Sequence, residues 1–155
     1  MQGVNVRMKC FCLLNHTLTE KQIAELKNDW HCDEIVYPSD DLAYDWGHIP
    51  ATKELEFSKV FNLIHEWFYN NKIKAGDTVI IQGEMGITYA LIEHVKNLRA
   101  IPIYAVSERR SKDEKMVDGS TKKTSYFEHV CFRKYEPYSD LLFRKQLEKK
   151  SPMKD

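Results

Sequence analysis

Short apolar runs alternate with amphipathic stretches along most of the chain. Four of the apolar runs have strand length: Met8–Leu14, Glu34–Tyr37, Thr78–Gln82 and Ile101–Val106. The stretches between them are typical of helices, at Glu20–Asn28, Asp40–Trp46, Thr52–Lys72 and Ile87–Leu98. Strands that alternate with helices predict an α/β fold, with a doubly wound parallel sheet and right-handed crossovers.

The last third of the chain departs from this alternation. Asp118-Gly119 is a strong hairpin signal, and Lys122–Arg133 follows as a returning arm with apolar positions. Ser139–Lys150 is expected to form a terminal helix. We therefore expect one domain over residues 1–138, with a hairpin at 107–135, and a helical tail at 139–155. The pattern leaves open whether the hairpin extends the sheet or reaches over a partner.

The start of the first helix is marked by its side chains. Thr19 is a strong N-cap candidate, and Gln22 three residues later completes a capping box. The helix that follows is expected to turn Ile23 and Leu26 toward the core.

Charge is balanced overall but unevenly distributed. The 155 residues include 23 Lys and Arg and 23 Asp and Glu. Residues 1–107 hold 10 of the basic and 14 of the acidic residues, and residues 108–155 hold 13 and 9. The basic C-terminal third is either a solvated surface or a source of positive charge for an anionic ligand.

The four cysteines do not suggest a disulfide or a metal site. Cys10 and Cys12 share one face of a strand, and neither a CxxC pair nor a zinc-like Cys/His spacing occurs. We expect reduced, mostly buried thiols, with no metal and no cofactor. No apolar run has membrane-spanning length and the N-terminus lacks a signal-peptide core, so we expect a cytoplasmic protein.

The first candidate site is the turn Gln82-Gly83-Glu84-Met85-Gly86, between a buried strand and a helix. In a parallel sheet this turn lies at the carboxyl edge, where α/β proteins bind ligands. Free N–H groups at the helix start favour an anion, although Glu84 would repel a phosphate placed there. Thr88 and Tyr89 follow one turn later. The glycine spacing matches neither a Walker A loop nor the dinucleotide fingerprint, so an ordinary βα turn is the alternative.

The second candidate site is Asn15-His16-Thr17, directly after the first strand. In a doubly wound sheet this turn neighbours the turn after the third strand, so two polar turns converge on one crevice. His16 is a candidate general acid or base near neutral pH. The alternative is a turn in which Asn15 and Thr17 bond locally.

Ser107, Arg109 and Arg110 follow the fourth strand and are expected at the same edge of the sheet. Arginine presents a fork of donors that matches phosphate. Consecutive arginines of an extended chain point to opposite sides, so only one of them faces a given ligand. The alternative is a charged edge strand that resists aggregation.

Five stretches, taken in order, resemble a known family. They are Leu13–Glu20, Glu34–Pro38, Val79–Tyr89, Ile101–Ala105 and the Asp118-Gly119 hairpin ending in His129–Tyr135. Together they resemble the CRISPR-associated type III accessory family Csx-twenty over about residues 8–136. The Asn-His-Thr-Leu-Thr and Gln-Gly-acidic-x-Gly pieces carry most of the resemblance.

The resemblance implies a Rossmann-like (CARF-like) sheet in a homodimer that binds cyclic oligoadenylate, with cyclic tetra-adenylate as the expected ring. It also implies a ring nuclease, which cuts this signal without a metal and switches off type III CRISPR signalling. The implied catalytic residues are His16 and Arg109. The implied ligand-binding residues are Asn15, Thr17, Gln82, Gly83, Glu84, Met85, Gly86, Thr88, Ser107 and Arg110. Neither a membrane nor a long nucleic acid is expected as a partner.

Two other functions remain open at this point. The protein would bind cyclic oligoadenylate without cleaving it, as a sponge, or it would serve as a Rossmann-like scaffold that binds a partner protein through its hairpin.

Overall fold

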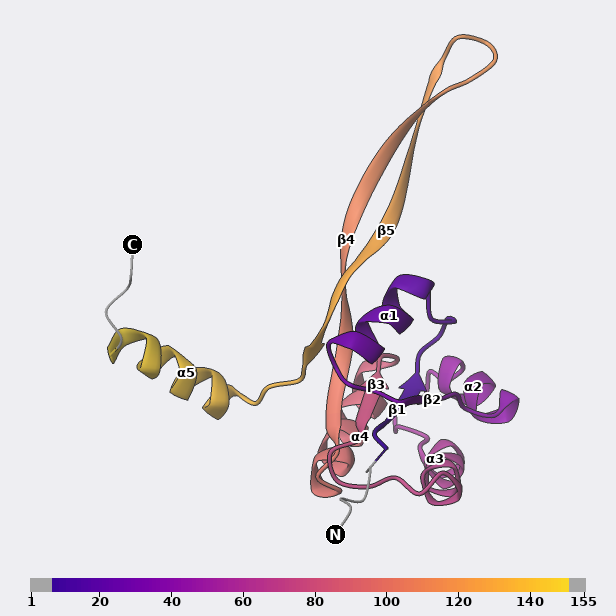
Figure 1. Ribbon diagram of the computed structural model, residues 1–155. Coiled ribbons are helices and arrows are strands. Elements are labelled where there is room, and N and C mark those ends of the chain that lie inside the picture. Colours follow the sequence, from indigo (N-terminus) through magenta and orange to yellow (C-terminus); the bar gives the residue numbers. More distant parts are fainter. Residues whose placement is uncertain (1–6, 151–155) are drawn as a thin grey trace.

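A five-stranded sheet in the order β2-β1-β3-β4-β5 organises the computed structural model, which describes residues 7–150 (Figure 1). The strands are β1 Lys9–Leu13, β2 Glu34–Val36, β3 Thr78–Ile81, β4 Ile101–Lys115 and β5 Thr121–Lys134. The helices are α1 Glu20–Asn28, α2 Asp40–Gly47, α3 Ser58–Asn70, α4 Met85–Asn97 and α5 Tyr138–Lys150. Strands β2, β1, β3 and β4 pair in parallel, and β5 pairs antiparallel with β4. The predictions of an α/β fold and of a first strand beside the third are confirmed.

Helices cover both faces of the central strands. On one face Phe11 of β1 packs edge-on against Trp67 and Phe68 of α3, with ring centroids 5.2 and 5.4 Å apart. On the other face Cys10 and Leu26 belong to a second apolar cluster, beneath α1. Burial on both faces explains why the central strands read as continuous apolar runs.

Helix α1 begins as its sequence predicts. The Thr19 hydroxyl accepts a hydrogen bond from the Gln22 N–H at 3.2 Å, and the Gln22 side chain accepts one from the Thr19 N–H at 3.0 Å. Leu26 is fully buried and Ile23 partly buried, both in the cluster between α1 and the sheet.

Helix α3 is shorter than predicted, because it starts at Ser58 rather than at Thr52. The Thr52 hydroxyl donates to the Glu54 carbonyl at 2.6 Å, a local bond that competes with helix formation. Phe57 occupies the N-cap position and provides no side-chain cap. Residues 49–57 therefore form an irregular segment between α2 and α3.

The hairpin falls at the predicted residues 107–135, but its first arm is a direct continuation of β4, which corrects the position of Ser107. Strand β4 continues through Ser107 to Lys115 without a turn, so the expected end of the strand at Val106 is wrong. A register shift between Val106 and Ser107 marks the place where the β4–β5 ribbon leaves the sheet. Beyond it the ribbon projects from the body (Figure 1). Gly119 has a φ of +86° and supports the predicted hairpin turn.

Helix α5 lies to one side of the ribbon, away from the other helices (Figure 1). The terminal helix is thus confirmed, and none of its residues is buried. The outer ends of the expected segments, residues 1–6 and 151–155, lie outside the described residues. Across residues 7–150 no helix is both long and apolar enough to cross a bilayer.

Replacing Thr19 tests the capping box. Thr19→Ala removes the hydroxyl that satisfies the Gln22 N–H, and we expect a loss of about 0.5–2 kcal/mol of unfolding free energy. Thr19→Ser keeps the acceptor and should retain most of the stability. Urea denaturation followed by circular dichroism measures both variants; equal stability of the two would contradict the assigned cap.

Candidate functional site

A cavity of about 660 Å³ lies at the carboxyl ends of β1 and β2. One side is formed by Asn15, His16 and Thr17, all exposed. The other lining residues come from β1, the end of β2 and α2: Cys12, Leu14, Tyr37, Pro38, Ala43, Gly47 and His48. The Asn15–Thr17 turn therefore borders an open space large enough for a small ligand.

The His16 ring is oriented by its neighbour. Its Nδ1 atom lies 3.0 Å from the Thr17 carbonyl oxygen. Because a carbonyl only accepts hydrogen bonds, Nδ1 carries a proton in this geometry, and Nε2 is the acceptor atom of the neutral ring. His16 is therefore arranged to take up a proton through Nε2.

Gln82 extends the sheet with its side chain. Its backbone N–H donates to the Leu13 carbonyl at 3.2 Å. Its Oε1 atom accepts from the Ala105 N–H at 2.9 Å, and its Nε2 atom donates to the Ala105 carbonyl at 3.5 Å. The amide thus takes the place of a backbone peptide between β3 and β4, and its polar atoms are engaged by the protein itself.

Gly83 lies against the ring of Trp46. A Cβ atom at Gly83 would lie 2.7 Å from two ring atoms of Trp46, closer than real contacts allow. Trp46 is 1% exposed, and its indole N–H donates to the Gln82 carbonyl at 2.9 Å. Close packing against a fixed indole accounts for this glycine.

Glu84 occupies the anion position at the start of α4. Its carboxylate accepts from the N–H groups of Gly86 at 3.0 Å and Ile87 at 2.9 Å. These backbone hydrogen bonds lower the pKa of Glu84, with the bond from Ile87 the largest cause. The expectation of free N–H groups for an anion at this helix start is therefore wrong for these two groups, because a carboxylate already caps them.

A second hollow, of about 360 Å³, lies on the outer side of this turn. Met85 and Tyr89 are strongly exposed there, at 86% and 66%. The complete lining is Gln82, Gly83, Met85, Thr88, Tyr89, Ile92 and Tyr135. The Tyr135 hydroxyl donates to the Ile81 carbonyl at 2.5 Å, which fixes this ring at the end of β3. The hollow offers aromatic surface beside the glycine turn.

Ser107, Arg109 and Arg110 lie on the ribbon rather than in a turn at the sheet edge. Ser107 pairs with His129 across the strands. Arg109 donates to the Ser125 hydroxyl at 3.3 Å. Arg110 forms ion pairs with Glu128 at 3.0 Å and Glu108 at 2.8 Å. Within one protomer the two turns thus follow neighbouring strands but line separate hollows, so the predicted single crevice is not formed, and the arginines lie on a separate element.

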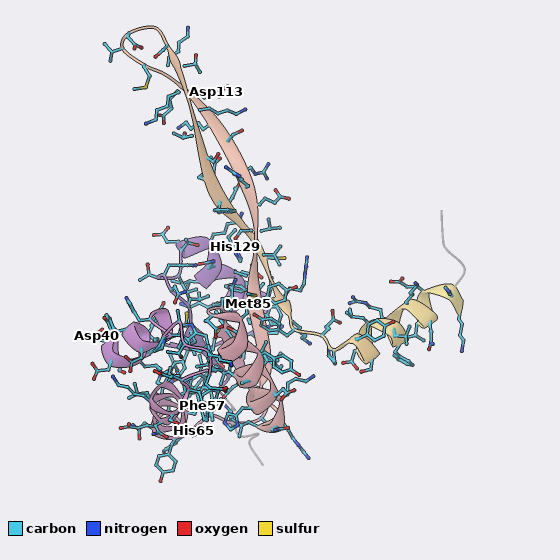
Figure 2. All side chains as sticks on the ribbon, turned by 180° about the vertical axis from the view of Figure 1, so that it is seen from behind. Asp40, Phe57, His65, Met85, Asp113 and His129 are labelled. Atoms are coloured by element: carbon cyan, nitrogen blue, oxygen red, sulfur yellow. The ribbon has the colours of Figure 1, made fainter. Side chains whose placement is uncertain are left out.

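A buried network at the base of the ribbon involves His129, which is not among the candidate residues of the sequence analysis. Figure 2 shows His129 at the base of the ribbon and Asp113 far out along it. His129 Nδ1 lies 3.3 Å from the Gln22 side-chain nitrogen, and Nε2 lies 2.7 Å from Glu25 Oε1. The Gln22 oxygen is held by the Thr19 N–H, so its nitrogen donates to Nδ1 and the His129 Nε2–H donates to Glu25.

Glu25 of α1 binds two residues of β5 and one residue of the loop after α1. Its second oxygen accepts from the Phe132 N–H at 2.7 Å and from the Trp30 indole at 3.1 Å. The carboxylate thereby ties α1 to β5. Because Glu25 and its β5 partners are more than 100 residues apart, no local sequence pattern predicts these bonds. The available signal was the position of Glu25, a carboxylate next to the inward-facing Leu26 of α1.

Taken together, the fold and the two hollows define an α/β protein with a candidate ligand site at the carboxyl ends of β1 and β3. The chain belongs to the family described as "Uncharacterized protein MJ1673 family", whose model matches residues 8–133. It is 34% identical over 130 residues to "Uncharacterized protein MJ1673" of Methanocaldococcus jannaschii, covering 84% of this chain and 98% of that protein. No solved structure matches the chain significantly. Both turns lie inside the matched region, and α5 lies outside it.

Two glycine variants test the packing at the turn. Gly83→Ala places a methyl group against Trp46, and we expect a loss of about 1–3 kcal/mol from overpacking. Gly86→Ala meets atoms no closer than 3.4 Å within a helix, so it should be neutral or stabilise by up to about 1 kcal/mol. Denaturant titration compares them. A Gly83→Ala protein as stable as Gly86→Ala would show that Trp46 moves freely.

Removing the Glu25 carboxylate tests the network. Glu25→Ala leaves three donors without this acceptor, from His129, Phe132 and Trp30, and we expect a loss of roughly 2–4 kcal/mol. Glu20→Ala, an exposed carboxylate on the same helix, is the control and should lose less than about 1 kcal/mol. Equal losses in urea denaturation would refute a structural role for the buried carboxylate.

Proposed function

We propose that this protein is a homodimeric ring nuclease with a Rossmann-like (CARF-like) sheet, which binds cyclic oligoadenylate and cleaves it without a metal. We propose cyclic tetra-adenylate as the preferred ring and the cytoplasm as the place of action. The resemblance to the Csx-twenty family supplies the chemistry of the ligand. The proposal draws its structural support from the two polar turns and the space beside them.

The observation that carries the proposal is the adjacency of these turns. Strands β1 and β3 pair from Cys10 to Leu13, and the Gln82 N–H bonds to the Leu13 carbonyl. The Asn15–Thr17 turn and the Gln82–Gly86 turn therefore leave neighbouring strands, each beside an open hollow. A two-fold axis would present both turns twice to a ring of four nucleotides, which itself has near two-fold symmetry.

Cleavage of such a ring needs alignment and one proton acceptor. The ribose 2′-hydroxyl attacks the adjacent phosphorus, and the bond from phosphorus to the 5′-oxygen breaks. The leaving 5′-oxygen takes a proton from solvent, to which His16 later returns the proton it accepted, so the products carry a 2′,3′-cyclic phosphate and a 5′-hydroxyl. His16 Nε2 accepts the proton of the attacking hydroxyl while its Nδ1–H is held by Thr17. Alignment alone contributes as much as roughly 7–11 kcal/mol to such reactions.

The remaining site residues take binding roles in this proposal. Asn15 and Thr17 contact phosphate or ribose. The exposed ring of Tyr89 offers a surface on which an adenine can stack. Arg109 stabilises the charge of the phosphorane; it is preferred to Arg110 because its contact is a hydroxyl, whereas Arg110 is neutralised by two carboxylates.

One observation favours a second candidate, a sponge that binds the ring without cutting it. Both arginines make their contacts inside the ribbon, and Glu84 caps the α4 N–H groups that would otherwise meet a phosphate. Weak charge stabilisation near the turns suits binding more than catalysis. Product formation decides between the two candidates.

The test measures cleavage of cyclic tri-, tetra- and hexa-adenylate, each with and without a chelator. We expect multiple turnover on cyclic tetra-adenylate that the chelator does not change. His16→Ala should lower the single-turnover rate by about 10²–10⁴-fold, because a general base is lost. His65→Ala replaces an exposed imidazole on α3 and serves as the control.

Three results would overturn parts of this proposal. Stoichiometric binding of the ligand without product formation would refute the nuclease and support the sponge. Wild-type rates in His16→Ala from pH 5 to 8 would remove the acid–base role of His16. Unchanged affinity and rate in Arg109→Ala would move the phosphate contact to another residue.

A further inference from the structure

The outward face of α5 is apolar and uncovered. Phe143 and Leu147 lie four residues apart, on one face of the helix, and are 63% and 50% exposed. Leu141 lines a different hollow, next to Tyr135, and Arg144 pairs with Glu136. The side of α5 with Leu141 and Arg144 therefore faces the segment that joins β5 to α5. Phe143 and Leu147 lie on the other side and remain largely exposed in the described part of the chain.

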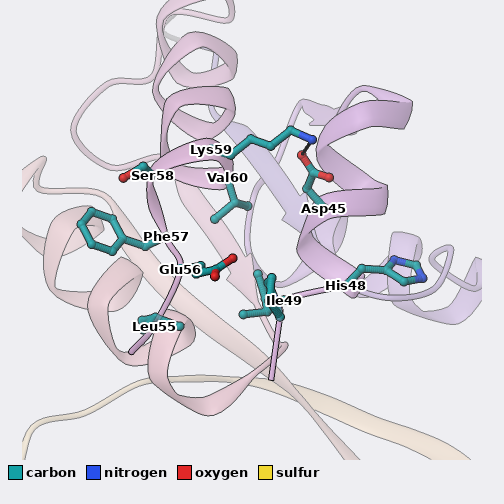
Figure 3. Close-up of a pocket in the computed structure, with 10 residues that line it drawn as sticks. Asp45, His48, Ile49, Leu55, Glu56, Phe57, Ser58, Lys59 and Val60 are labelled. Carbon is teal, nitrogen blue, oxygen red and sulfur yellow. Dashed lines mark ion pairs between the residues drawn. The ribbon is translucent and has the colours of Figure 1, made fainter. Parts of the chain in front are cut away.

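A second apolar surface lies between α2 and α3 and shares His48 with the hollow beside the Asn15–Thr17 turn. A cavity of about 450 Å³ is lined there by Ile49, Leu55, Phe57 and Val60, with Asp45 and Glu56 at its sides (Figure 3). Phe57 is 53% exposed. This α2–α3 groove exists because residues 49–57 are irregular rather than helical.

The charges of the two surfaces are complementary. Residues 40–60, which build the groove, include five acidic and two basic residues. Helix α5 carries four basic residues and two acidic ones. Lys59 already pairs with Asp45 at 3.4 Å, which leaves Glu56 as the carboxylate beside Phe57 that a cation of α5 can meet.

Helix α5 is kept away from the groove of its own protomer. Tyr135 is anchored to Pro102 and Ile81 by two hydrogen bonds, and only three residue steps separate it from the helix start at Tyr138. Three steps span about 10 Å and the helix adds about 8 Å as far as Phe143, so even a straight path to Phe143 falls short of the roughly 19 Å of four strand spacings between β5 and β2. Helix α4 also packs on the intervening strands, and Figure 1 shows α5 and α3 on opposite sides of the ribbon.

We propose that the α2–α3 groove of one copy receives α5 of a second copy. Phe143 and Leu147 enter the apolar cavity beside Phe57, and the basic residues of α5 face the acidic segment around it. Reciprocal exchange of the two helices closes the contact into a two-fold dimer, so that no binding surface is left open. The surface assigned here is the one that would hold the proposed homodimer together.

Site-directed crosslinking tests this contact between two copies. One chain carries Phe57→Cys and a second chain of different mass carries Phe143→Cys, both with Cys131→Ser because Cys131 is partly exposed. The other three cysteines are buried. A short bismaleimide should join the two chains into a product of mixed mass. Joining of two Phe143→Cys chains instead, or of Phe57 and Phe143 within one doubly substituted chain, would overturn the proposal.

Sedimentation measures the same contact without a crosslinker. The wild-type protein should be dimeric, and Phe143→Ser with Leu147→Ser should weaken the dimer by at least about tenfold, since two apolar anchors are lost. Tyr69→Ser removes an exposed ring of α3 outside the groove lining and should leave the dimer intact. A monomeric wild-type protein would refute the exchange. A monomeric wild type would also remove the proposed homodimer, whereas a dimer that Phe143→Ser with Leu147→Ser leaves intact would overturn this surface alone. Neither experiment uses a nucleotide, so ring cleavage is tested independently.

Discussion

One glutamine residue, through its backbone and its side chain, joins most of the parts on which the candidate site depends. Gln82 bonds to β1 through its backbone N–H and to β4 through its amide, and its carbonyl accepts the indole N–H of Trp46 from α2. The ends of three strands and one helix are thereby fixed by one residue. The low exposure of Trp46 and the glycine that follows Gln82 are consequences of this junction. The polar turns are held at the sheet edge by rigid surroundings, which suits a site that must align a ligand.

Local rules account for the parts of the fold that sequence reasoning predicted. The capping box at Thr19, the Asp-Gly turn of the ribbon and the apolar strands each depend on residues close together in the chain. The neighbouring positions of β1 and β3 followed from the alternation of strands and helices. Two of the errors also arise from hydrogen bonds between residues close together in the chain. The Thr52 hydroxyl bonds to Glu54 instead of capping an earlier start of α3. The Glu84 carboxylate binds the N–H groups of α4 that an anionic ligand was expected to meet.

Distant contacts account for the rest. The bonds from Glu25 to β5 join residues more than 100 positions apart, and the burial of His129 depends on them. The sequence placed Ser107 at a chain reversal, but pairing with β5 carries β4 straight on. The same pairing moves Arg109 and Arg110 onto the ribbon. Strand order therefore placed the two turns correctly after neighbouring strands, but they line separate hollows rather than one crevice, and the positive charge was placed too close to them.

The register shift between Val106 and Ser107 interrupts the regular pairing of the two strands at the base of the ribbon. A two-stranded ribbon with both faces in water has little packing of its own to stiffen it. From Ser107 to Lys115 it extends about 30 Å, so a bend of about ten degrees at the shift would displace its tip by roughly 5 Å. Arg109 lies only two residues beyond the register shift and would move far less than the tip. A ribbon of this kind can adapt its end to a partner while keeping the residues next to the sheet almost in place.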